Sequence, residues 1–111
     1  MWSTYPDAVI DNSHMTTNSG QALTIAVEIE QHSKGSKRYK ELIKKHRMNI
    51  DRDRYDHVIY LLGDAVLRDN FERLFHRLMD SMFTKDEAGK AKNRFSFDTY
   101  EDLSERIRAL G

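Results

Sequence analysis

The clearest pattern of hydrophobic and polar positions lies in residues 22–30 (ALTIAVEIE). Every second position is aliphatic, at Leu23, Ile25, Val27 and Ile29. The positions between them hold Thr24, Ala26, Glu28 and Glu30. Because side chains alternate between the two faces of a strand, this pattern predicts a β-strand with one aliphatic face. Residues 5–11 predict a shorter strand, and the Asn-, Ser- and Gly-containing stretch 12–20 predicts the turn of a hairpin between the two.

Helical spacing begins after this strand. Over residues 36–48, a stripe with spacings of three and four predicts a helix with one buried side: Tyr39, Leu42, Ile43 and His46. The apolar run at residues 57–62 (HVIYLL) predicts a buried strand. Asp64 then has the position of an N-cap for a long helix that reaches about Phe83.

The C-terminal third is less regular. Residues 85–93 are polar and predict a loop, and residues 95–98 predict a last short strand. Thr99 and Asp102 have the spacing of a capping box for a helix that ends near Gly111. The predicted order is therefore β-β-α-β-α-β-α, an α/β fold with a small mixed sheet flanked by helices.

The length and composition favour one soluble domain spanning residues 1–111. A chain of 111 residues, 39% hydrophobic and 32% charged, suffices for a single core. It contains no cysteine, which excludes disulfides and thiolate metal sites. No apolar run is long enough to span a bilayer, and the first residues lack the features of a signal peptide. We therefore expect a cytoplasmic protein with no membrane partner.

The net charge of zero conceals a strongly basic segment. Residues 31–54 carry nine basic and three acidic side chains, a net charge of +6, which leaves −6 for the rest of the chain. Such a distribution favours a localised anion-binding face, with DNA as the expected partner. The candidate DNA-binding residues are Lys37, Arg38, Lys40, Lys44 and Lys45. The alternative is an ordinary solvated helix surface.

The carboxylates are the candidate chemistry. Glu28 and Glu30 lie two apart on a strand and so share one face, and a hairpin would bring Asp7 beside them. Like charges this close repel one another, and Mg²⁺ or Mn²⁺ relieves such repulsion because hard cations prefer oxygen ligands. A bound metal could activate water against a phosphodiester, with Lys34, or Lys37 in reserve, stabilising the transition state. The alternative is that both glutamates occupy a solvated strand face.

These residues also resemble a known arrangement. Pro6-Asp7, then Glu28-Ile29-Glu30 after an apolar run, is similar to the PD-(D/E)xK signature of restriction-endonuclease-like nucleases. The longer pattern over about residues 5–62, with the Arg38-Tyr39 helix and the HVIYLL strand, resembles the nuclease-like part of MobC-type plasmid mobilisation relaxases and replication-relaxation proteins. The resemblance implies a restriction-endonuclease-like fold, Asp7 and Glu28 as metal ligands, and metal-dependent DNA nicking.

Two departures from that family qualify the resemblance. Glu30 stands where the superfamily usually has lysine, which makes it a third expected ligand or catalytic carboxylate and leaves the lysine role to Lys34. Only four residues precede Tyr5, whereas the family generally places a helix before this strand. We therefore expect either a fragment of a longer relaxase-like protein or a reduced domain lacking that helix.

Other chemistries find no motif. The five histidines form no metal-binding pair, and the phosphate-binding, dinucleotide-binding and nucleophile-elbow motifs are missing. Three functions remain open: a Mg²⁺- or Mn²⁺-dependent endonuclease domain, a non-catalytic DNA-binding accessory module, and a protein-interaction module of a conjugation or replication assembly. The third would use the wide apolar stripe of residues 71–83, which also favours a homodimer if it is not entirely core.

Overall fold

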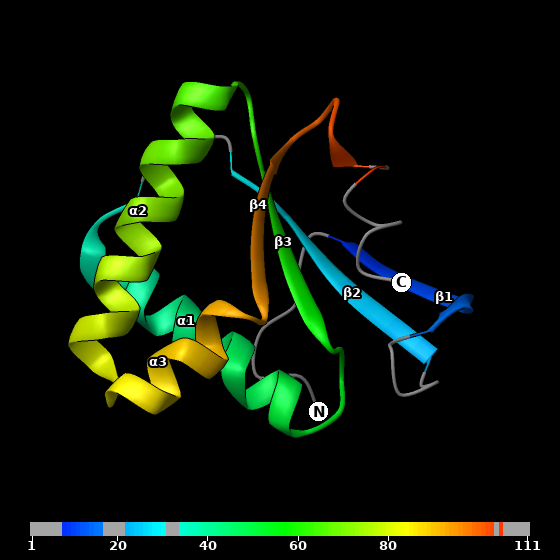
Figure 1. Ribbon diagram of the computed structural model, residues 1–111, viewed down its shortest axis with the longest axis horizontal. Helices are drawn as coiled ribbons and strands as arrows, with labels where there is room; N and C mark the ends of the chain where they lie inside the picture. The colour runs from blue at the N-terminus through cyan, green and yellow to red at the C-terminus, as the bar shows by residue number, and fades with distance from the viewer. Residues whose placement is uncertain (1–7, 17–21, 31–33, 104, 106–111) are drawn as a thin grey trace.

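The computed structural model describes residues 8–16, 22–30, 34–103 and 105, and for residues 8–16 and 22–23 it describes the backbone. Four strands form a single sheet in the order β1-β2-β3-β4 (Figure 1). These strands are β1 (Ala8–Thr16), β2 (Ala22–Ile29), β3 (His57–Leu62) and β4 (Phe95–Thr99). Three helices connect them: α1 (Ser36–Asp51), α2 (Ala65–Met82) and α3 (Lys85–Lys92).

The sheet is mixed, as the sequence predicts. β1 pairs antiparallel with β2 in the predicted hairpin, with Ala8 opposite Val27, and the register shifts between Asn12 and Thr16. β2, β3 and β4 are parallel to one another. Glu28 lies opposite Tyr60 in the β2–β3 register, and the main-chain N–H of Glu30 continues that ladder by donating to the Leu61 carbonyl at 3.1 Å.

All three helices cover the same face of the sheet, on the left in Figure 1. The strand order explains this, because the chain steps in one direction from β2 to β3 to β4. Crossovers between parallel strands are right-handed, so two steps in the same direction place their helices on the same face. α1, α2 and α3 therefore flank one face of the sheet.

Local sequence sets the helix starts. Asp64 caps α2 as predicted, since its Oδ1 accepts from the main-chain N–H of Leu67 at 2.9 Å. Thr84 caps α3 in the same way through Glu87 N–H, and Asp86 and Glu87 in the first turn suit the positive end of the helix dipole. Neither Asp64 nor Thr84 needs a tertiary contact to start its helix.

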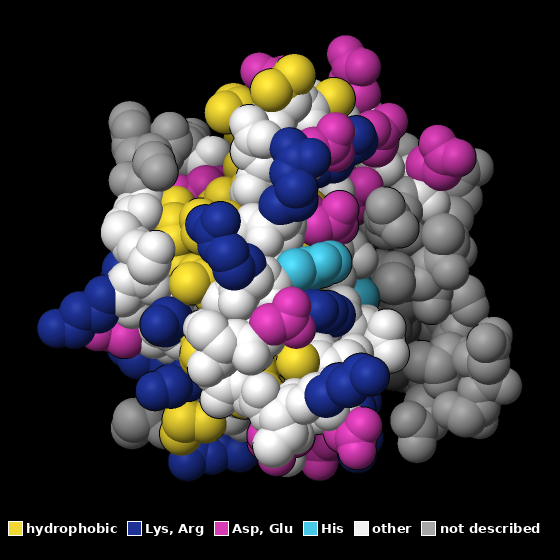
Figure 2. All heavy atoms as spheres, turned by 60° about the vertical axis from the view of Figure 1, so that its left-hand side comes forward, with side chains coloured by type: hydrophobic (Ala, Val, Ile, Leu, Met, Phe, Trp, Pro, Cys, Tyr) yellow, Lys and Arg dark blue, Asp and Glu magenta, His cyan; other side chains and the backbone are white. Residues whose placement is uncertain are grey.

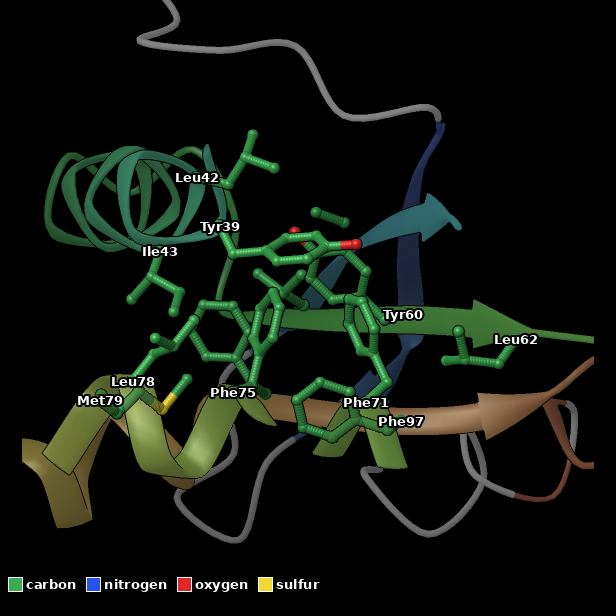
Figure 3. Close-up of a cluster of buried hydrophobic side chains, with 14 of the residues drawn as sticks. Tyr39, Leu42, Ile43, Tyr60, Leu62, Phe71, Phe75, Leu78, Met79 and Phe97 are labelled. Carbon is green, nitrogen blue, oxygen red and sulfur yellow. The ribbon is translucent and has the colours of Figure 1, made fainter. Parts of the chain in front are cut away.

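The main core lies between the sheet and the helices and is rich in aromatic side chains (Figure 3). Tyr39 of α1 meets the edge of Phe71 of α2, with ring centroids 5.2 Å apart and planes at 87°. Phe71 and Phe75 stack at 4.5 Å, and Phe75 lies 5.0 Å from Tyr60 of β3. Such edge and offset contacts add to the free energy gained by burying the rings.

The apolar stripe of α2 belongs to this core. Phe71, Phe75, Leu78 and Met79 are buried there, and Leu74, Met82 and Phe83 pack against it half-buried. The stripe therefore finds its partners within the domain. This removes the observation that favoured a dimer or protein-interaction surface on that helix.

The opposite face of the sheet carries a smaller cluster. Ile25, Val27, Ile59 and Leu61 are buried there, and Leu103 packs against them. On the same strand faces, His57 Nε2 lies 2.7 Å from Ser96 Oγ. The alternation predicted for residues 22–30 is confirmed for those of its side chains that the structure describes. The face that holds Glu28 and Glu30 is the one that the helices cover, whereas the alternative expectation was a solvated face.

Two expectations are corrected, and a third is not confirmed. Residues 85–93 are not a loop, because α3 occupies Lys85–Lys92, so the order through β4 is β-β-α-β-α-α-β. The first strand reaches Thr16, through residues predicted to be a turn, because β2 supplies a partner backbone up to Ala22. The restriction-endonuclease-like order is not confirmed, whereas the α/β class with its mixed sheet is.

The last predicted helix is described at its start. Thr99 Oγ1 donates to Asp102 Oδ2 at 3.1 Å, and Leu103 and Glu105 are helical. The remainder of that helix, and the predicted strand residues 5–7, lie outside the described residues. None of the helices in the described part of the chain has the length and apolar character needed to cross a membrane.

Candidate functional site at the carboxyl end of strand β2

The candidate site is built around Glu30, the residue that follows β2. Its side chain is only 7% exposed, and its Oε1 accepts from Lys34 Nζ at 2.9 Å and from the Tyr39 hydroxyl at 3.3 Å. Lys34 is 38% exposed and also lies 5.9 Å from the centroid of the Tyr39 ring. The sequence-predicted pair of Glu30 and Lys34 is thus brought together, with the ammonium facing solvent and the carboxylate beneath it.

Tyr39 holds this arrangement from α1. Its hydroxyl accepts from the main-chain N–H of Lys34 at 2.8 Å while it donates to Glu30. Its ring is buried among the core aromatics, so the position of the hydroxyl is fixed by packing (Figure 3). The sequence places Tyr39 in the buried stripe, but nothing in the sequence indicates that its hydroxyl joins both ends of the segment between β2 and α1.

Glu28 lies on the same strand face, one pleat before Glu30, and is half-buried. Its negative charge contributes to raising the pKa of two neighbouring tyrosines, after burial, which is the larger cause. Burial of Tyr55 raises its pKa to about 12. Tyr60 lies directly opposite Glu28, and its pKa is raised well above its usual range by burial and then by Glu28 and Glu30. Both phenols therefore stay protonated at neutral pH.

Beneath the glutamates lies a buried polar network centred on His46. Its Nδ1 lies 2.6 Å from Tyr55 Oη and its Nε2 lies 3.2 Å from Tyr60 Oη. Asn49 Nδ2 donates to Tyr55 Oη at 3.1 Å. Burial lowers the pKa of His46 to about 4, so the ring is neutral at pH 7 and joins two hydroxyls as one donor and one acceptor.

The sequence does not predict most of this network. The sequence predicts His46 on the buried stripe, which is confirmed, and the spacing of the histidines indicates no metal cluster. Tyr55, Tyr60 and Asn49 carried no site prediction. One usable signal was present: Asn49 falls three residues after His46 and so shares its buried side of α1, where a polar side chain needs a partner.

The sequence-predicted metal ligands are Asp7, Glu28 and Glu30. Within the described ranges, no three His, Asp or Glu side chains come together as a metal-binding group. Asp7 lies outside the described residues, while its neighbour in sequence, Ala8, pairs with Val27, the residue before Glu28. Carboxylate oxygens of Glu28 and Glu30 suit Mg²⁺ or Mn²⁺, although the Oε1 atom of Glu30 is engaged by Lys34.

The predicted DNA-binding residues all lie on α1, and helix geometry divides them. With about 100° per residue, Lys37, Lys40 and Lys44 follow one stripe, and Arg38 and Lys45 lie on the other side of the exposed surface. Arg38 pairs with Glu41 at 3.3 Å. The three lysines of the stripe make no ion pair with any residue that the structure describes.

Figure 2 shows Lys and Arg side chains on several parts of one face, with more of them toward its left, and Asp and Glu side chains more frequent toward its upper right. The uneven charge of the sequence is therefore also uneven in space, as a localised anion-binding face requires.

Comparison with known protein families, with curated proteins and with solved structures found no match to this chain.

Proposed function

We propose that this chain is a divalent-metal-dependent DNA-nicking domain with its site at the carboxyl end of β2. The observation that carries the proposal is the contact between Glu30 and Lys34, with Glu28 on the same strand face. In open sheets with parallel strands, ligands bind beyond the carboxyl ends of the strands. Glu30 and Lys34 follow β2, and Glu28 is its second-last residue. The resemblance to PD-(D/E)xK nucleases implies catalytic roles for the same residues.

The chemistry would divide among these side chains. Glu28 and Glu30 would hold Mg²⁺ or Mn²⁺, with Asp7 as the third ligand that the resemblance implies. A metal held there would lower the pKa of a bound water and polarise the phosphodiester. The attacking water would form the new bond to phosphorus and lose a proton to solvent, while the bond from phosphorus to one sugar oxygen would break and that oxygen would take up a proton from solvent.

Lys34 would stabilise the negative charge that develops on the phosphoryl oxygens, because its ammonium is exposed enough to meet a phosphate. Glu30 and Tyr39 hold the lysine in place, one through its side chain and the other through its main chain. Tyr39 is therefore a positioning residue. The neutral network of His46, Tyr55 and Tyr60 would support the strand and helix beneath the site without exchanging protons near pH 7.

The test is nicking of supercoiled plasmid in Mg²⁺, in Mn²⁺ and in chelator. We expect metal-dependent nicking that falls by at least about a hundredfold in Glu28→Gln and in Lys34→Met. Glu72→Gln, which neutralises a half-buried carboxylate on α2, is the matched control and should nick like the wild type. Nicking that persists in chelator, or that survives Glu28→Gln, would show that the carboxylates do not form the site.

A non-catalytic DNA-binding module is the second candidate, favoured by the three lysines of the α1 stripe that have no ion-pair partner among the described residues. It predicts retardation of DNA on a gel without nicking under any metal condition. Because both readings use the same basic face, the nicking assay separates them and the gel does not.

A further inference from the structure

A small hollow opens at the other end of α1, away from the glutamates, between α1, α3 and the start of β4. Its volume is about 150 Å³, and it is lined by Ile43, Arg47, Asp51, Lys90, Ala91, Arg94 and Phe95. Three of these side chains are cationic, one is anionic and three are apolar. We propose that this hollow binds a phosphate group, and that the phosphate belongs to the backbone of a DNA strand lying along α1.

The cations keep the capacity to bind an anion. Lys90 makes no ion pair with any described residue. Arg94 donates one Nη1 hydrogen bond to the Asp56 carbonyl at 3.0 Å, which anchors a guanidinium that has five donors in all. Arg47 stacks over Phe83 at 4.6 Å and reaches Glu87 only at 3.7 Å, so packing orients it while its ion pair is loose. Guanidinium groups held in this way suit the oxygens of a phosphate.

These cations also offset negative charge within the domain itself. α1 and α3 both end near the hollow, and Lys90 in the last turn of α3 would offset the negative end of its dipole. Each helix end is equivalent to roughly half a negative charge, so two ends together contribute about −1. Asp51 contributes another −1 against three positive charges. Within the lining a net positive charge of about one remains, beside apolar side chains that weaken screening, and the loose pair of Arg47 with Glu87, outside the lining, offsets part of it.

The hollow also continues a line of charge. Arg47 follows Lys37, Lys40 and Lys44 at spacings of three, four and three, so the four side chains run down one side of α1. From Lys37 to Arg47 the helix rises by roughly 15 Å, long enough to follow several phosphates of one strand. This continuity is what favours a DNA backbone as the source of the phosphate. The inference rests on the DNA binding of the proposed function, but not on cleavage.

The experiment measures affinity for a fluorescently labelled duplex by anisotropy, in chelator so that the DNA stays intact, over a series of salt concentrations. Losing one phosphate contact lowers the slope of log affinity against log salt by about 0.9. We expect Lys90→Gln to show that loss and a severalfold weaker affinity, whatever the DNA sequence. Lys85→Gln removes the same charge from the exposed start of α3, outside the hollow, and should keep the wild-type slope.

A second pair of variants predicts a gain rather than a loss, which damage to the fold would not produce. Asp51→Asn removes the only anionic side chain of the hollow and should tighten binding severalfold, whereas Asp86→Asn on α3 should not. Equal slopes for Lys90→Gln and wild type, or equal losses for Lys90→Gln and Lys85→Gln, would overturn the proposal.

Two further binding measurements distinguish an internal phosphodiester from a terminal or free phosphate. Duplexes with and without 5′-phosphates should bind equally if the hollow takes an internal phosphodiester, and inorganic phosphate should compete only weakly. Binding that requires the 5′-phosphate would overturn the backbone assignment and identify a terminal monoester instead. If the protein does not nick DNA but Lys90→Gln lowers the salt slope, catalysis is excluded and the phosphate site in the hollow is supported. If the protein nicks DNA and Lys90→Gln leaves the slope unchanged, catalysis is supported and the phosphate site is excluded.

Discussion

His46 Nδ1 lies 2.6 Å from Tyr55 Oη, in a part of the core where the imidazole is fully buried. The contact joins the middle of α1 to the segment just before β3. Because a second hydroxyl, that of Tyr60, occupies the other ring nitrogen, a proton added to His46 would have to be accommodated without water. We therefore expect the contact that fixes α1 to make the fold sensitive to acid.

We predict that the domain loses about 2 kcal/mol of stability between pH 7 and pH 5 through His46 alone. Burial lowers its folded pKa from 6.5 to about 4, so between these values the unfolded chain binds the extra proton. Stability is thus fully present above pH 6.5 and falls as the pH drops toward 4. Urea unfolding across this range should show the loss in the wild type.

The control is a second histidine. His76→Gln, on α2 outside the network, should keep the pH dependence, whereas His46→Gln should flatten it at a lower overall stability. A wild type whose stability is level from pH 7 to pH 5 would show that His46 is not held neutral by the fold.

Tyr39→Phe should separate positioning from packing. The substitution keeps the ring among Phe71 and Phe75 but removes the hydroxyl that joins Lys34 N–H to Glu30. We expect a cost of about 1 kcal/mol in unfolding free energy and a larger effect, about tenfold or more, on the nicking rate. Nicking at the wild-type rate would mean that Lys34 finds its position without Tyr39.

The N-cap of α2 gives a prediction that is independent of function. Asp64→Ala leaves the main-chain N–H of Leu67 without its acceptor and should cost about 1 kcal/mol, measured by urea unfolding. Asp64→Ser, which restores a capping oxygen, should recover most of it. Equal losses in the two variants would assign the effect to the charge of Asp64 instead of its cap.

The sequence predicts an element of this fold where the residues of that element alone carry a signal for it. β3 is predicted to its last residue because a short apolar run followed by Gly63 is typical of a buried strand, and all six of its side chains are indeed buried. The start of α2 follows from Asp64, which needs only its own helix. α3 was missed because only Ala88 and Ala91 touch the core, so the segment carries no apolar stripe. Its local signal is the Thr84 cap followed by Asp86 and Glu87 in the first turn.

The site is predicted less well, for a physical reason. Glu28, Glu30 and Lys34 lie within seven residues of one another, so strand alternation and proximity suffice to group them. The partners that define their surroundings come from elsewhere in the chain: Tyr39 from α1 and Tyr60 from β3. Whether Tyr60 lies opposite Glu28 is a matter of strand register, and the alternation within one strand does not set its register with the next.

The last prediction uses the division of charge on α1. If DNA lies along the stripe that ends at Arg47, the triple variant Lys37→Gln/Lys40→Gln/Lys44→Gln should lower the salt slope by nearly three, because each lysine would neutralise a separate phosphate. The double variant Arg38→Gln/Lys45→Gln removes two positive charges from the other exposed side of the same helix and should change the slope by much less. Anisotropy with the same labelled duplex measures both. If each variant lowers the slope in proportion to the charge removed, the affinity reflects net charge alone, and DNA does not follow the stripe.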